Sequence, residues 1–210
     1  AEDMFRMSKP DAPIYIAEMQ GGWFDKWDGI GYTKMREALG DEQINIMTKT
    51  ALSQGCTIFN HYMAVGGTSW GNLACDEVYT SYEFCAGIDE YGSIHPNFYK
   101  AKETNYFLNS FGLTQTDERE NLDFGENIYA VKRKDFENDC SWLFVRNLNS
   151  EITQINLDGT SISLKPYDMK IIPQNLKCYA GEIELSDVEI FARIKNENKE
   201  VIFLLSDALA

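Results

Sequence analysis

Two apolar runs separated by a helical stretch constrain what this chain can fold into more than any other feature. Residues 13–18 form the first run, and residues 56–65, between Gly55 and Gly66, form the second. In the stretch between them, apolar residues recur at helical spacing after Asp41, a residue type that caps helices. Near-continuous apolar strands that alternate with helices are typical of parallel sheets covered on both faces. The first part of the chain is therefore predicted to be α/β.

The sequence pattern changes after Gly112. Before it, a loop rich in small polar residues spans 66–92, and a helix is predicted from Pro96 to residue 111. Residues 113–126 are polar and acidic, which is typical of a linker. From residue 127 onward, apolar and polar residues alternate as they do in antiparallel strands. The predicted organisation is an α/β segment over 1–112, a linker over 113–126 and an all-β, antiparallel domain over 127–210.

The charge balance narrows the classes of partner. With 33 acidic and 19 basic residues, the formal net charge is -14. Such a chain is a poor partner for nucleic acid or an anionic membrane, and it suits neutral ligands. No apolar run is long enough to span a membrane, and the sequence starts with no basic, apolar leader. No set of His, Cys and carboxylate residues has metal-ligand spacing, so we expect no catalytic metal and no cofactor.

Cysteine usage bears on the compartment. The five cysteines are an odd number without a C-x-x-C motif, and no N-x-S/T sequon is present. These features lean towards a reducing, cytoplasmic compartment without fixing it. Cys75 and Cys85 fall in the predicted loop and could pair.

Polar and aromatic side chains follow both predicted strands. Glu18 ends the first run and is followed by two glycines and Trp23, while Tyr62 stands in the second run. Ligands of α/β folds bind at the carboxyl ends of parallel strands, so both junctions are expected to share one cleft. A carboxylate can attack an oxocarbenium-like centre, and an indole face can stack on a sugar ring. The pattern therefore favours a sugar-cleaving site.

At three blocks the resemblance to a known family becomes specific. The blocks are 13–25 (PIYIAEMQGGWFD), 60–72 (NHYMAVGGTSWGN) and 80–84 (TSYEF). In this order and spacing, the chain resembles glycoside hydrolase family 35, the family of many retaining β-galactosidases. The resemblance implies that residues 1–112 are the C-terminal portion of a (β/α)8 TIM barrel, its last two strands and helices, followed by a β-rich domain.

The resemblance also implies roles for individual residues. Glu18 matches the catalytic nucleophile, and Trp23 matches an aromatic residue that lines the galactose pocket. Tyr62 matches a tyrosine close to the nucleophile and is expected to hold Glu18 by a hydrogen bond. Phe84 stands where relatives usually carry a second sugar-contacting tyrosine, and Tyr82 is a candidate to replace the missing hydroxyl.

The second carboxyl group that a retaining mechanism needs is not evident. In the family the acid/base glutamate belongs to an Asn-Glu pair on an earlier barrel strand, and no such pair precedes Glu18. A full barrel takes about 250 residues. The chain is therefore expected to be a fragment that is inactive alone and that forms an oligomer or pairs with the missing N-terminal barrel portion. Substitute proton donors in the loops would be Asp25, Asp28, Glu83 and Glu90.

Three functional hypotheses follow from these residues. The first is part of a retaining, exo-acting β-glycosidase that cleaves terminal β-galactosides or related oligosaccharides. The second is an exo-β-glucosaminidase of the same family, because the residues that select the sugar hydroxyls would lie upstream of this chain. The third is a carbohydrate-binding or structural module without catalysis.

Overall fold

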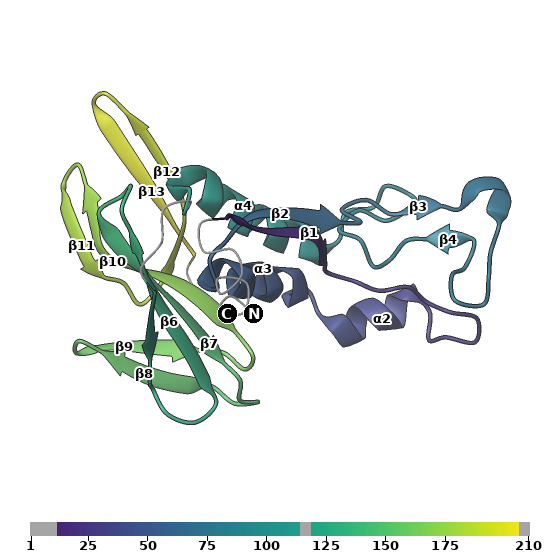
Figure 1. The fold of residues 1–210 in the computed structure, drawn as a ribbon, viewed down its shortest axis with the longest axis horizontal. Coiled ribbons are helices and arrows are strands. Elements are labelled where there is room, and N and C mark those ends of the chain that lie inside the picture. The colour runs from purple at the N-terminus through teal and green to yellow at the C-terminus, as the bar shows by residue number, and fades with distance from the viewer. Residues whose placement is uncertain (1–11, 114–118, 206–210) are drawn as a thin grey trace. The chain divides into compact units, whose positions relative to one another are not determined.

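The computed structural model describes residues 12–113 and 119–205. These residues form mostly antiparallel strands, and three α-helices lie among them (Figure 1). The chain divides into two compact units. The first, called here the strand-end unit, comprises Pro13–Thr48 and Ile58–Glu103, and the second, the sheet unit, comprises Lys49–Thr57 and the chain from Thr104 onward.

The strand-end unit is built around two hydrogen-bonded strands. These are β1 (Ile14–Gln20) and β2 (Cys56–Tyr62), which run in the same direction in Figure 1. The chain between them forms α2 (Tyr32–Leu39) and α3 (Gln43–Ser53). After β2, a two-stranded hairpin pairs β3 (Gly67–Thr68) with β4 (Ser81–Tyr82), and α4 (Pro96–Phe111) follows.

The two apolar runs and two of the helices agree with the sequence prediction. Helix α3 lies in the stretch after Asp41, and α4 begins at Pro96. Gly112 follows α4 with a positive φ of 76°, a conformation that glycine adopts without strain. The expected burial of both strands on both faces is wrong for this chain, because Tyr15 is 58% and Ile58 is 47% exposed.

Three elements were missed by the sequence prediction in this unit. Helix α2 has no buried residue, and both glycines that flank it, Gly31 and Gly40, have positive φ. The β3–β4 hairpin and a 3₁₀ turn at Trp70–Asn72 lie inside the region predicted as one long loop. Within 12–113 and 119–205, no helix is both long and apolar enough to cross a lipid bilayer.

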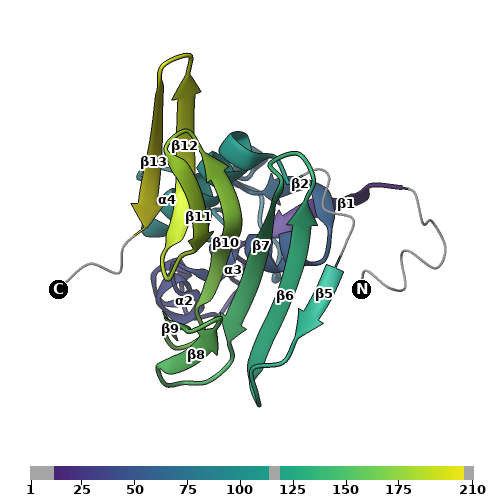
Figure 2. The ribbon, with the colours of Figure 1, turned by 90° about the vertical axis from the view of Figure 1, so that its left-hand side faces the viewer.

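The sheet unit contains a five-stranded antiparallel sheet, seen face-on in Figure 2. Its strands, in spatial order, are β11 (Gly181–Leu185), β10 (Met169–Cys178), β7 (Cys140–Asn147), β6 (Ile128–Asp135) and β5 (Arg119–Leu122). Two further hairpins are β8 (Thr153–Leu157) with β9 (Thr160–Leu164), and β12 (Glu189–Asn196) with β13 (Lys199–Leu205). The antiparallel prediction is confirmed, and β5 is an additional strand inside the polar segment read as a linker.

The core of the sheet unit lies on both sides of β7. One face of the strand packs Leu143 and Val145 into a cluster with the β8–β9 hairpin. The other face packs the Trp142 ring against Phe107 and Phe111 of α4, at centroid distances of 4.9 and 4.8 Å. Strand β7 is therefore buried on both faces, because helix and hairpin cover opposite sides of the sheet.

All five cysteines are free thiols, so the predicted pairing of Cys75 with Cys85 is wrong. Cys75 is exposed on the loop between β3 and β4, whereas Cys85 is only 2% exposed. Burial raises the pKa of Cys85 to about 11 and that of Cys140 to about 12. Buried thiols of this kind act as small apolar side chains.

Candidate active site

Both predicted junction residues lie near the carboxyl ends of adjacent strands. Glu18 is the third residue from the end of β1, and Tyr62 is the last residue of β2. Because β1 and β2 are hydrogen-bonded neighbours in one sheet, the loops that follow them emerge at the same edge (Figure 1). The two strands are therefore neighbours, which is the condition for the shared cleft that the sequence predicts.

The Glu18 carboxylate is exposed and is oriented by a near neighbour. Gln20, two residues on and thus on the same face of β1, donates from Nε2 to Glu18 Oε2 over 2.9 Å. The tyrosine expected to make this contact, Tyr62, is hydrogen-bonded elsewhere. Gln20 was present in the matched block, and its spacing from Glu18 is the signal that could have identified it.

Five aromatic rings form a cluster that includes Tyr62, the last residue of β2. The Phe84 ring lies 4.7 Å from Phe24 and 5.2 Å from Tyr62, centroid to centroid, and 6.0 Å from Trp23. Phe24 also stands 4.8 Å from Tyr82. Edge-to-face packing at these separations is favourable beyond simple burial. All four predicted substrate-binding residues therefore belong to one cluster, which Phe24 completes.

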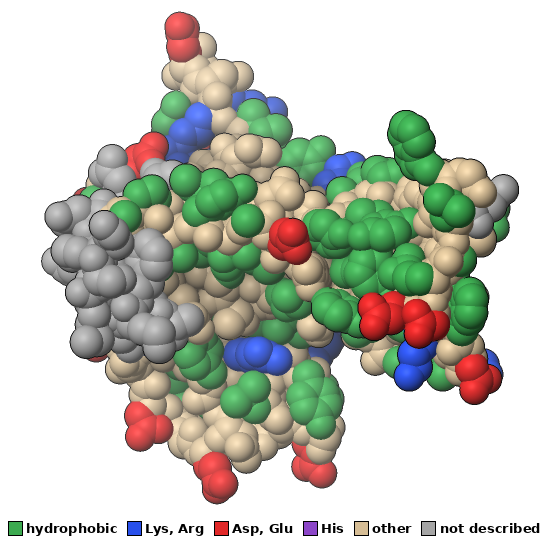
Figure 3. Space-filling model, turned by 45° about the vertical axis from the view of Figure 1, so that its right-hand side comes forward, with side chains coloured by type: hydrophobic (Ala, Val, Ile, Leu, Met, Phe, Trp, Pro, Cys, Tyr) green, Lys and Arg blue, Asp and Glu red, His purple; other side chains and the backbone are tan. Residues whose placement is uncertain are grey.

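The members of this cluster differ in how far they reach solvent. Phe84 is 1% exposed, so its ring faces the other aromatic rings and not solvent. Trp23 is 57% exposed, although its ring contacts both Phe24 and Phe84. Apolar side chains gather on the visible face of this unit, with acidic side chains beside them (Figure 3). Of the predicted binding residues, Trp23 offers the most surface to a ligand.

Two tyrosine hydroxyls form the polar part of the cluster. Tyr62 Oη and Tyr82 Oη are 2.6 Å apart, and either can be the donor. This hydrogen bond, burial and the nearby charge of Glu18 raise the pKa of Tyr82 to about 12. At neutral pH Tyr82 is therefore an uncharged hydroxyl, able to donate to or accept from an alcohol.

Three of the four loop carboxylates considered as substitute proton donors have other partners, and the fourth, Asp28, is exposed. Asp25 is 2% exposed and accepts a hydrogen bond from the Gly31 amide at 2.8 Å. Glu83 forms an ion pair with Arg36, and Glu90 accepts from Thr68 Oγ1 at 2.8 Å. Within the described residues, no group of three or more His, Cys, Asp and Glu side chains could hold a metal ion.

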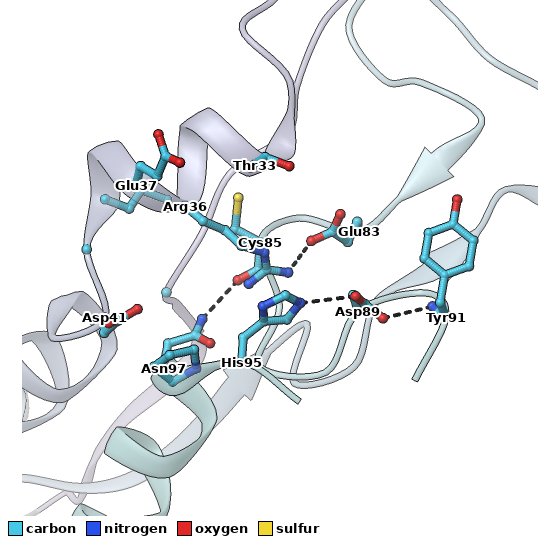
Figure 4. Close-up of a pocket in the computed structure, with 14 residues that line it drawn as sticks. Thr33, Arg36, Glu37, Asp41, Glu83, Cys85, Asp89, Tyr91, His95 and Asn97 are labelled. Atoms are coloured by element: carbon cyan, nitrogen blue, oxygen red, sulfur yellow. Dashed lines mark hydrogen bonds and ion pairs between the residues drawn. The ribbon is translucent and has the colours of Figure 1, made fainter. Parts of the chain in front are cut away.

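A pocket of about 530 Å³ is lined in part by Glu83 and Cys85, the neighbours of Phe84 in sequence (Figure 4). Its wall includes Arg36 and Glu83, together with His95, whose Nε2 lies 3.0 Å from Asp89 Oδ2. Hydrogen bonds from the Tyr91 and Ser93 amides, together with His95, lower the pKa of Asp89 to about 2 against the opposing effect of desolvation. Glu18 and Trp23 are not among the residues that line this pocket.

Comparison with known proteins identifies one family. The family described as glycosyl hydrolases family 35 matches residues 1–107 of the chain. The chain is 26% identical to Beta-galactosidase A from a Penicillium species over 93% of its own length. It is 28% identical to Probable beta-galactosidase C of Talaromyces marneffei over 93%, and 28% identical to Probable beta-galactosidase E of Aspergillus fumigatus over 95%.

These similarities extend past the family match into the sheet unit, because they cover 93–95% of the chain. In the other direction, the chain covers 22% of each of these three relatives. It therefore spans about a fifth of the length of the curated relatives that it matches.

Proposed function

This chain belongs to glycosyl hydrolase family 35, and we propose on that premise that it supplies the nucleophile side of a retaining, exo-acting β-galactosidase site. One observation carries the proposal. An exposed carboxylate, Glu18, stands near the end of β1, and the neighbouring strand β2 ends at Tyr62 of an aromatic cluster whose Trp23 is half exposed. Galactose is proposed as the sugar because all three relatives are named β-galactosidases or probable β-galactosidases.

In the proposed reaction, Glu18 attacks the anomeric carbon of a terminal β-galactoside. The leaving alcohol departs with a proton from a second carboxylic acid, and a covalent glycosyl-enzyme forms on Glu18. Water then cleaves that ester bond, so two inversions at the anomeric carbon restore its configuration. The hydrogen bond from Gln20 supports this role, because it orients one carboxylate oxygen and leaves the other for attack.

The aromatic cluster is proposed to form the sugar-binding surface. Trp23 would stack on the apolar face of the sugar ring, and the Tyr62 and Tyr82 hydroxyls would meet its hydroxyl groups. Phe84, which is buried and contacts the rings of Trp23 and Tyr62, would support these two rings without touching the sugar. Its lack of a hydroxyl leaves the polar contact to the neighbouring tyrosine pair.

The acid/base group is proposed to come from outside this chain. A retaining site needs its two carboxyl groups about 5 Å apart. Asp25, Glu83 and Glu90 are engaged by an amide, an arginine and a threonine. The chain also spans about a fifth of its relatives. We therefore assign residues 1–112 to the last two strands and helices of a TIM barrel. Residues 127–210 are assigned to a β-domain that also takes in β5 of the segment 113–126 predicted as a linker, with completion by a longer chain or an oligomer.

Turnover by the chain on its own tests this incompleteness. Without a proton donor for the leaving alcohol, we expect the chain to hydrolyse methyl β-galactoside no faster than a Glu18→Gln variant of it. The measurement is release of galactose at neutral pH. Turnover by the unchanged chain well above that of the variant would contradict the assignment of the acid/base group to another segment.

A trapping experiment tests the nucleophile. The protein expressed from the complete reading frame is incubated with 2,4-dinitrophenyl 2-deoxy-2-fluoro-β-galactoside, whose fluorine slows cleavage of the glycosyl-enzyme. We expect one fluorogalactosyl group per protein, placed on Glu18 by peptide mass spectrometry. Hydrolysis of 4-nitrophenyl β-glucosaminide by the same protein reports on the exo-β-glucosaminidase alternative. A label on another carboxylate would remove Glu18 from its role, and binding of galactose without labelling would favour a carbohydrate-binding module.

A further inference from the structure

The segment Ser81–Ala86, called here the strained turn, carries two of the proposed sugar-site residues, Tyr82 and Phe84. Phe84 and Cys85 have φ values of 60° and 54°. Two consecutive side chains in the left-handed region are unfavourable, because the Cβ atom crowds the backbone there. Such a conformation persists only where surrounding contacts hold it.

The contacts that hold the strained turn come from its pocket side (Figure 4). Arg36 of α2 donates from Nη1 to the Ala86 carbonyl over 2.8 Å, and its Nη2 pairs with the Glu83 carboxylate. Asn97 adds a bond from Nδ2 to the Cys85 carbonyl at 3.0 Å. The guanidinium thus holds both a side chain and a backbone carbonyl of the same turn with one rigid group.

This ion pair is shielded from water. The Arg36 and Glu83 side chains are 17% and 12% exposed. Water screens such a pair less than a surface pair, and loss of one partner leaves the other charge poorly compensated. The pair is therefore a stronger constraint on the turn than a solvent-exposed pair such as Lys177–Glu182, whose side chains are 57% and 36% exposed.

Another side of the strained turn forms the aromatic cluster. The Phe84 ring contacts Phe24, Tyr62 and Trp23, and Tyr82 pairs its hydroxyl with that of Tyr62. A rotation of the backbone at 84 or 85 would move the Phe84 ring away from the rings of Phe24, Tyr62 and Trp23. The backbone conformation that Arg36 holds is the one in which these contacts form.

We propose that Arg36 and Glu83 are a positioning pair for the sugar site. They hold the strained turn in its left-handed conformation and so fix the rings of Tyr82 and Phe84 relative to Trp23. This inference rests on the proposed function for the identity of the ligand. Neither residue is assigned a contact with sugar, and Glu83, as a partner of Arg36, is not the proton donor.

Amide hydrogen exchange on this chain tests the pair directly. The Ala86 and Ile88 amides are hydrogen-bonded to the carbonyls of Glu83 and Ala64, so they report opening of the turn. In Arg36→Met, we expect exchange of the peptide 79–90 to quicken at least tenfold while peptides of the sheet unit are unchanged. Arg36→Lys keeps the charge but not the two-pronged geometry, and its effect should be smaller.

Ligand affinity is measured on the same proteins. Calorimetric titration with isopropyl 1-thio-β-galactoside should show at least tenfold weaker binding by Arg36→Met and partial recovery in Arg36→Lys. Glu83→Gln, which keeps an oxygen acceptor for Arg36, should also be milder than Arg36→Met. Lys177→Met, which breaks an exposed ion pair in the sheet unit, should alter neither measurement.

The possible outcomes distinguish failure of the positioning pair from failure of the proposed function. Unchanged exchange at 79–90 in Arg36→Met, or quickened exchange across the whole chain, overturns the positioning pair. Quickened local exchange with unchanged affinity overturns it as well. If Arg36→Met does not fold, exchange at 79–90 and thiogalactoside affinity are compared with the unchanged chain in Arg36→Lys and Glu83→Gln instead. Absence of thiogalactoside binding by the unchanged chain speaks against the proposed function alone, and local exchange then decides whether the pair holds the turn.

Discussion

Glu18→Gln in the protein expressed from the complete reading frame is expected to lower kcat for an aryl β-galactoside by roughly 10⁴-fold or more, the scale of effect seen when a catalytic nucleophile is removed. An amide cannot form the proposed glycosyl-enzyme, so the proposed two-step route would be lost. The substitution keeps the shape of the side chain and an oxygen that can accept from Gln20 Nε2, so the local fold should persist. The measurement is the initial rate of phenol release, with a thermal melt to verify folding.

A matched control and a rescue experiment sharpen this result. Glu90→Gln alters an acidic loop residue that accepts from Thr68, and it should leave the rate near that of the unchanged protein.

In Glu18→Ala, added azide can enter the vacated space and attack from the nucleophile's face. The product should then be the α-galactosyl azide. A β-galactosyl azide would instead place Glu18 in the acid/base role, and a retained rate in Glu18→Gln would end its assignment altogether.

Gly22→Ala is expected to destabilise the strand-end unit by about 3 kcal/mol, the upper part of the range for overpacking. An ideal Cβ atom at Gly22 would lie 1.8 Å from the Phe84 carbonyl oxygen, which is backbone and cannot rotate away. The strained turn would have to move, and with it the aromatic cluster. In a chain of this size the loss corresponds to a fall in Tm of about 6–12 °C.

Gly67→Ala is the control for this substitution. A Cβ atom there meets nothing within 4 Å, and Gly67 has no positive φ. Its melting temperature should stay within about 2 °C of the unchanged chain, since surface changes of this kind are within about 0.5 kcal/mol. Thermal unfolding followed by circular dichroism compares the two. Equal melting temperatures for both variants would mean that the close approach of Gly22 to the turn is not needed for stability.

Sequence periodicity predicted the parts of the fold whose apolar residues recur at regular spacing. The runs at 13–18 and 56–65, the helix after Pro96 and the alternating strands after residue 127 all appear in the structure. Helix α2 was missed although Tyr32, Met35 and Leu39 have helical spacing and Gly40 follows. Its short length and its lack of any buried residue made that signal weak.

The candidate site was predictable in its residues but not in its contacts. The matched blocks identified Glu18 and the members of the aromatic cluster. They did not reveal that Gln20 binds Glu18, that Tyr62 pairs with Tyr82, or that Phe84 is buried. Arg36 was missed because it lies 47 residues from Glu83 in sequence. Left-handed backbone at Phe84 and Cys85 has no local signal, since neither residue is a glycine or asparagine.

The unequal burial of the thiols gives this chain a natural attachment point. Cys56, Cys85 and Cys140 are buried, and burial also raises the pKa of the partly covered Cys178. Alkylation requires the thiolate and access to it, so a maleimide at neutral pH reaches Cys75 first. The backbone carbonyl of the next residue, Asp76, accepts a hydrogen bond from the Trp27 amide at 3.1 Å. A fluorescent dye coupled to Cys75, without any engineered cysteine, would report on ligands that reach the exposed Trp23 and Trp27.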